Sequence, residues 1–142
     1  MNRLVAFGII GMIGVFASAC SEESGATGPS TASRLEGNWS LVAFEPAVGS
    51  VATVEDSQAY TIEFTSDGQL GMRADCNRCS SSYEAHGLDL SVGGLACTRV
   101  ACPPESKSNE FIRAVSDASS YLRHDETLFL YYAGGRLRLQ QN

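Results

Sequence analysis

The stretch YTIEFTSDGQLGMRADCN, residues 60–77, decides the fold class of this chain. Apolar and polar residues alternate over 60–65, which is the period of a half-buried β-strand. Asp67 and Gly68 then predict a tight turn, because glycine accepts a positive φ and aspartate can bond its own backbone. The alternation resumes over 70–74, so the stretch predicts a β-hairpin.

Similar patterns on both sides of this hairpin predict more short strands. They lie at residues 39–44, around Tyr83 and Ala85, at 88–92, at 127–132 and around Leu137 and Leu139. Residues 45–58 contain Pro46, Gly49 and acidic side chains and are interpreted as a loop. No strand is predicted at 121–125, where Arg123, His124 and Asp125 follow two apolar residues.

One segment changes period. From Ser108 to about Ala118, apolar residues recur at spacings of three and four, which predicts one amphipathic helix. About seven or eight short strands with one helix indicate an α+β fold. The expected architecture is a small, curled antiparallel sheet, or a barrel-like sheet, with the helix packed against it.

The first 19 residues have the pattern of an export signal. Arg3 is their one charged residue, and the chain is apolar or Gly from Leu4 to Phe16. Such a segment is shorter than the ~20 residues that a membrane-spanning helix needs. Cleavage of the signal removes Arg3, so the mature chain has a net charge of −7, compared with −6 for the full sequence.

Residues 17–20, Ala-Ser-Ala-Cys, resemble the lipobox of bacterial lipoproteins, in which the chain is cut before the cysteine and a diacylglycerol is attached to its sulfur. The lipobox usually has Leu where Ala17 stands, and the same residues also fit an ordinary signal-peptidase site. The cysteine count of 5 favours lipidation of Cys20, since an even number then remains. Ser21 and Glu22 resemble sorting to the outer membrane.

Residues 20–34 contain no large apolar side chain before Arg34 and predict a flexible tether. Residues 35–142 are then one domain. The expected location is the bacterial cell envelope, where the domain is anchored by lipid in the outer membrane and faces the periplasm. Nucleic acid is not an expected partner, because Lys107 is the chain's one lysine and the net charge is negative.

Four cysteines of the domain permit two interpretations. Cys76 and Cys79 are followed, after 17 residues, by Cys97 and Cys102. Four thiolates at similar spacings can form a structural zinc site, although the second pair is wider than that pattern. An exported chain instead favours disulfides. In a nested pairing, Cys76 with Cys102 and Cys79 with Cys97, the two bridges would cross-link the segment that follows the 60–74 hairpin at its base and inside it. We favour the disulfides and predict no metal and no cofactor.

The residues also resemble a known family. Asp67-Gly68 with Cys76-Asn77, then Thr98-Arg99-Val100-Ala101-Cys102, and a Leu-x-Gly-x-Trp-x-Leu start at Leu35 that includes Trp39 are similar to the META domain, also called HslJ-like. The resemblance covers residues 35–140. Asp75 stands where the family often has Gly. Cys79 and Cys97 are additions to the common pattern, which supports pairing them with each other.

The resemblance implies a location and a scaffold but no reaction. Bacterial members are often envelope proteins, some are lipoproteins, and one is linked to stress. No catalytic residues are carried over, and the sequence contains no common catalytic motif. We therefore expect a non-enzymatic protein that binds an envelope partner. The alternative is a lipocalin-like carrier of a small apolar ligand, suggested by Gly37-x-Trp39; a filled barrel interior would rule it out.

Overall fold

The structure is a computed structural model that describes residues 34–142. The predicted signal (1–19), Cys20 and all of the predicted tether except Arg34 lie outside the described residues. In chain order the elements are β1 (Gly37–Pro46), β2 (Ala52–Thr53), the 3-10 helix η2 (Ser57–Ala59), β3 (Tyr60–Phe64), β4 (Gln69–Ala74), β5 (Asn77–His86), β6 (Asp89–Val92), β7 (Ala96–Cys97), α1 (Ser108–Ser116), β8 (Ser120–His124), β9 (Thr127–Tyr132) and β10 (Gly135–Gln141).

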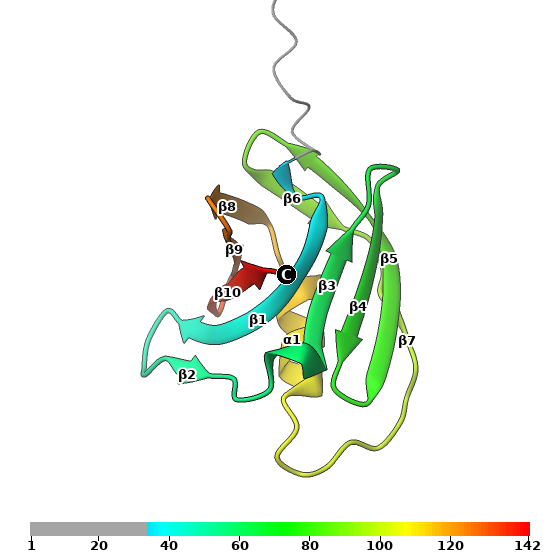
Figure 1. Cartoon of the computed structure of the whole chain (residues 1–142), viewed down its shortest axis with the longest axis vertical. Helices are drawn as coiled ribbons and strands as arrows, with labels where there is room; N and C mark the ends of the chain where they lie inside the picture. Colours follow the sequence, from blue (N-terminus) through cyan, green and yellow to red (C-terminus); the bar gives the residue numbers. More distant parts are fainter. Residues whose placement is uncertain (1–33) are drawn as a thin grey trace, which may run out of the picture.

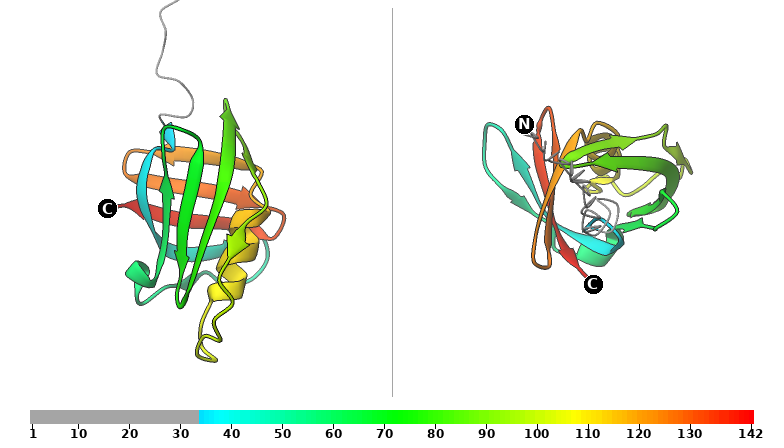
Figure 2. Two further views of the ribbon diagram at one scale, coloured as in Figure 1. Left: turned by 90° about the vertical axis from the view of Figure 1, so that its right-hand side faces the viewer. Right: turned by 90° about the horizontal axis from the view of Figure 1, so that it is seen from above.

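Eight strands close into one antiparallel barrel, in the order β1, β3, β4, β5, β6, β8, β9, β10 and back to β1 (Figures 1 and 2). The closing pair joins the first strand to the last, from Trp39 opposite Gln141 to Pro46 opposite Gly135. β2 and β7 are short additions that pair with β1 and β5. The predicted α+β fold, with a barrel-like sheet and one helix, is confirmed.

β1 can close the barrel because it is long and bent. Its register shifts between Leu41 and Ala43, so its first half pairs with β3, its second half pairs with β2, and β10 runs along both halves. Gly135 is needed where the two strands end. A Cβ at this position would lie 2.3 Å from the carbonyl oxygen of Glu45, and its φ of 143° also favours glycine.

The predicted hairpin over residues 60–74 is confirmed. β3 and β4 pair from Tyr60 opposite Ala74 to Phe64 opposite Leu70. The alternating apolar residues of both strands are buried, as their period of two requires. The connection from β4 to β5 is a turn of only two residues, Asp75 and Cys76, because Ala74 pairs directly with Asn77.

The prediction that residues 121–125 form no strand was wrong, because β8 occupies Ser120–His124. Tyr121 is buried in the core, as a strand residue of the inner face. Arg123 concealed the pattern. Its guanidinium carbon lies 5.0 Å from the ring centroid of Trp39, and its Nη2 donates to the side chain of Gln141. A charged residue can therefore take an inward position at the end of the barrel, with its stem on an aromatic ring.

Two further predictions, the loop at 45–58 and the strand around Tyr83 and Ala85, differ from the structure in extent. The predicted loop 45–58 contains β2 and the start of η2, whose Asp56 cap accepts a hydrogen bond from the backbone N–H of Gln58. β5 is also longer than predicted and begins at Asn77. The run Ser80–Ser82 concealed its alternation, since small polar side chains occupy both faces of the strand.

Helix α1 covers one end of the barrel. Phe111 is fully buried and packs edge to face against Phe44 of β1, at 6.5 Å, and Tyr60 of β3, at 5.7 Å. The helix was predicted from Ser108 to Ala118, and it ends two residues earlier. Among residues 34–142, no helix is long and apolar enough to cross a membrane.

The barrel interior is filled by side chains. Those that are fully buried include Trp39, Tyr121, Phe64, Phe111, Leu35, Leu41, Ile62, Leu70, Leu128, Leu130, Leu137 and Leu139. If the barrel enclosed an empty cavity of ligand size, the side chains lining that cavity would have solvent-accessible surface. The interior therefore does not favour the lipocalin-like carrier, which needs a cavity of roughly 300 Å³ or more.

Candidate functional site

The side chain of Asn77 fastens the segment between β7 and α1 to the barrel. Its Oδ1 accepts hydrogen bonds from the backbone N–H of Val100, at 2.8 Å, and the hydroxyl of Thr98, at 3.0 Å. Its Nδ2 donates to the carbonyl oxygen of Val100, at 3.1 Å, and to the hydroxyl of Ser108, at 3.3 Å. Asn77 is 5% exposed. An amide is suited to this position because it both donates and accepts.

Both predicted disulfides are present around Asn77, in the nested pairing. Cys76 is bonded to Cys102, and Cys79 to Cys97. Cys79 and Cys97 are directly opposite each other on β5 and β7. With all four sulfur atoms in disulfides, none is a thiolate ligand, so the structure supports the disulfide interpretation over the zinc one. Among the described residues, no group of three or more His, Cys, Asp or Glu side chains could hold a metal ion.

Asp75 explains how the chain departs from the family pattern beside Cys76. Its φ is 57°, in the left-handed region where glycine is common and aspartate is among the tolerated residues. Its backbone N–H donates to the carbonyl oxygen of Ala59, at 2.6 Å, and its carbonyl accepts from Nε of Arg73. The turn therefore keeps the glycine-like conformation without glycine.

The other predicted motif residues lie elsewhere. Asp67 and Gly68 form the β3–β4 turn, at the opposite end of the hairpin from Asn77. The φ of Gly68 is 78°, and a Cβ there would approach the carbonyl oxygen of Tyr83 to 3.3 Å. The Asp67 side chain accepts from the hydroxyl of Thr65. These residues shape a turn and do not join the Asn77 cluster.

Tyr83 supports the same turn from inside the barrel. Its hydroxyl donates to the carbonyl oxygen of Thr65, at 2.8 Å, and its ring packs edge to face on Phe64. Burial, and then the negative charge of Glu36, raise the pKa of Tyr83 above its usual value. The phenol therefore keeps its proton, and its role as a donor, to a higher pH than an ordinary tyrosine.

Trp39, the remaining motif residue, lies at the end of the barrel where β1 begins. Its ring is fully buried, and its Nε1 donates to the carbonyl oxygen of Leu35, at 2.8 Å. The guanidinium of Arg123 covers the ring. Trp39 is therefore a core residue that closes this end of the barrel.

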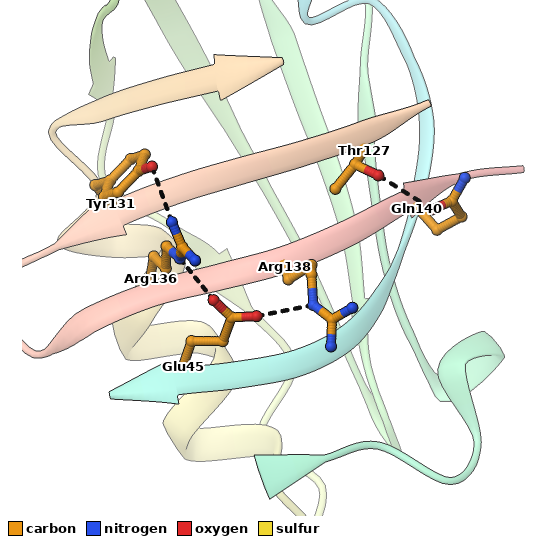
Figure 3. Close-up of polar contacts among 6 residues, drawn as sticks. All are labelled: Glu45, Thr127, Tyr131, Arg136, Arg138 and Gln140. Carbon is orange, nitrogen blue, oxygen red and sulfur yellow. Dashed lines mark hydrogen bonds and ion pairs between the residues drawn. The ribbon is translucent and has the colours of Figure 1, made fainter. Parts of the chain in front are cut away.

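Glu45 bridges the barrel seam on its outer face, a feature that the sequence analysis missed (Figure 3). Its carboxylate lies 2.6 Å from Nε of Arg136 and 2.8 Å from Nε of Arg138, both on β10. Arg136 also donates to the hydroxyl of Tyr131 and lies 4.5 Å from the ring centroid of Phe129. The alternation of Arg136 and Arg138 with buried leucines was the available signal, because it places both arginines outside.

We expect Glu45→Gln to lower the free energy of unfolding by about 1–2 kcal/mol, since two charge-assisted contacts across the closing pair are lost. Urea unfolding monitored by circular dichroism measures this change. Glu84→Gln is the control, because Glu84 is exposed and has no ion pair within residues 34–142. Equal effects of the two substitutions would show that Glu45 does not stabilise the seam.

The two histidines do not form a catalytic arrangement with the residues above. His86 ends β5 and His124 ends β8, each beside a turn. His124 lies 3.2 Å from the carboxylate of Asp125, and both side chains are more than four-fifths exposed. This contact is a local pair in solvent.

The fold and the Asn77 cluster define a class: a filled, eight-stranded antiparallel barrel with a disulfide-fastened segment before helix α1. A family model described as META domain matches residues 32–142. The chain therefore belongs to the META domain family. No curated protein matches it.

Solved structures share the fold. An NMR structure of a protein from Burkholderia xenovorans is 26% identical, with a TM-score of 0.64; the match covers 81% of this chain and 88% of that one. A DUF4847 family protein from Bacteroides vulgatus is 17% identical, with a TM-score of 0.55, over 76% and 94% of the two chains. A lipocalin-like protein from Bacteroides uniformis is 17% identical, with a TM-score of 0.52, over 77% and 99%. The latter two are similar in fold alone.

Proposed function

We propose that this protein is a lipid-anchored protein of the bacterial envelope that acts by binding, without catalysis. The observation that carries this proposal is the state of the cysteines. Four of the 5 cysteines are paired with one another, so none of them is available to Cys20, which directly follows an export-type signal. Attachment of a diacylglycerol gives Cys20 a chemical role in an oxidising compartment.

The domain supports binding through its surface. Its interior is filled, and its motif residues Trp39, Gly68 and Asn77 serve the fold. A partner in the periplasm or outer membrane would therefore contact exterior side chains. The family resemblance adds an expected role in envelope stress, and the residues after Cys20 favour the outer membrane.

Fractionation of cells tests the anchor, with the full-length chain compared to Cys20→Ala. The account predicts that the wild-type chain sediments with membranes, because acyl chains hold it there, and that Cys20→Ala is released as a soluble mature chain. Wild-type chain recovered in the soluble periplasmic fraction would contradict the anchor.

Cross-linking in intact cells tests binding in the same two strains. We expect a discrete species of fixed mass above the monomer in the wild-type strain and its loss with Cys20→Ala, since the partner is met at the membrane. Monomer alone in both strains would contradict the proposed mode of action.

A further inference from the structure

Two arginines face each other on the outer face of β4 and β5, and a third arginine, Arg99, follows β7. Arg73 and Arg78 are directly opposite each other in the β4–β5 pair. Thr98 pairs with Arg78 through two backbone and hydroxyl contacts, from Thr98 N–H to Arg78 O and from Arg78 N–H to Thr98 Oγ1. Arg99 is the next residue and lines an open pocket together with Arg78. β4 and β5 lie side by side on this face (Figure 2).

These three arginines are exposed. No carboxylate among residues 34–142 lies within ion-pair distance of Arg73, Arg78 or Arg99. On the other side of the barrel, by contrast, Arg136 and Arg138 share Glu45. Like charges placed directly opposite each other on a sheet are destabilising. The chain has more acidic than basic side chains, yet it forms no ion pair at Arg73 and Arg78 within residues 34–142.

Open pockets adjoin the arginines, and Arg78 lines two of them. One has a volume of about 640 Å³ and is also lined by Arg99, Thr98 and Ser80. The other, of about 280 Å³, is also lined by Arg73, Thr61 and Glu63. Gly71 leaves open space in the second pocket, because among the described residues other than its chain neighbours no heavy atom lies within 4 Å of where its Cβ would be.

We propose that this face binds a phosphate group, through the guanidinium groups of Arg73, Arg78 and Arg99. Guanidinium donors match phosphate oxygens in pairs, and the hydroxyls of Ser80 and Thr61 can add donors. Glu63 is the one carboxylate that lines these two pockets, so their charged residues leave a net excess of positive charge. That balance favours a multiply charged phosphate over a single carboxylate. Phosphate binding at this face does not require the lipid anchor.

Titration of the Cys20→Ala mature chain with pyrophosphate at low ionic strength tests the site by calorimetry. We expect binding that weakens as salt is added, since exposed charges are screened. Arg78→Gln should weaken it by about tenfold or more, because Arg78 lines both pockets. Arg113→Gln is the matched control; it removes an exposed arginine from α1, outside both pockets. Its affinity should stay within about twofold of the parent.

Two results would overturn the proposal: no binding by the parent chain, or equal weakening by Arg78→Gln and Arg113→Gln. Thermal unfolding adds an independent readout. Arg78→Gln relieves the repulsion from Arg73, so its midpoint should equal or exceed that of the parent. A clear fall in the midpoint would mean that Arg78 stabilises the fold. That result would contradict the proposal, in which Arg78 lowers stability and is present for binding.

The source of the phosphate is distinguished by sedimentation of the same chains with vesicles. Binding to vesicles that contain phosphatidylglycerol, but not to phosphatidylcholine vesicles, together with loss in Arg78→Gln, supports a lipid headgroup. Binding of pyrophosphate without vesicle binding supports a soluble phosphate ligand. Absence of both contradicts the site.

Discussion

Reduction of both disulfides is expected to lower the free energy of unfolding by about 5 kcal/mol, as judged from the entropy of closing two nested loops. The inner bridge spans 18 residues and the outer one 26. Once the inner loop is closed, the outer bridge constrains only the residues between the two bridges, so its added effect is smaller. Small domains are stable by about 5–15 kcal/mol in total, so the reduced protein is expected to be marginal.

Urea unfolding with and without a phosphine reductant measures this effect. Serine variants separate the bridges: the Cys76/Cys102 pair and the Cys79/Cys97 pair should each cost about 2–3 kcal/mol with the other bridge intact. An unchanged midpoint, with labelling to show that all four thiols are free, would contradict the account. Recovery of the reduced protein's stability by one equivalent of zinc would restore the zinc interpretation.

Asn77→Ala is expected to lower the free energy of unfolding by about 3 kcal/mol, because buried polar groups lose their partners. The backbone N–H and C=O of Val100 and the hydroxyl of Thr98 would each lose a hydrogen bond. Hydrogen exchange should also show faster exchange of the amide of Val100, since the segment loses its attachment to the barrel.

Asn38→Ala is the control for Asn77→Ala. Asn38 is exposed, and its contact with Asn142 uses the backbone carbonyl, which alanine keeps. Its effect should stay within about 0.5 kcal/mol. A cost below about 1 kcal/mol for Asn77→Ala would show that water replaces the side chain, and that the cluster does not fasten the segment.

The sequence was most informative where one short segment carries the whole signal. The hairpin over 60–74 has both the period of a strand and turn residues, and the helix has apolar spacings of three and four. β8 was missed because its inward Arg123 lies on Trp39, a contact between residues far apart in the chain. β7 was missed because two residues carry no period; the bridge to Cys79 and the pairing with β5 define it.

In the candidate sites, too, local features could be predicted and contacts between distant residues could not. The nested cysteine pairing follows from the order of the strands, and the family resemblance indicated Asn77 and Thr98 as important. The sequence alone could not show that Asn77 holds both backbone groups of Val100, because this depends on how the segment after β7 folds back. The facing pair of Arg73 and Arg78 could have been derived from the two-residue turn. The shared pocket of Arg99 and Arg78 could not.

The intact mass of protein extracted from membranes, and alkylated with and without prior reduction, tests directly whether the domain is anchored and doubly bridged. We expect a chain that begins at Cys20 and carries a diacylglycerol, with no alkylated cysteine before reduction and four after it. A chain with an unmodified Cys20, or one whose four other cysteines react without reduction, would contradict it.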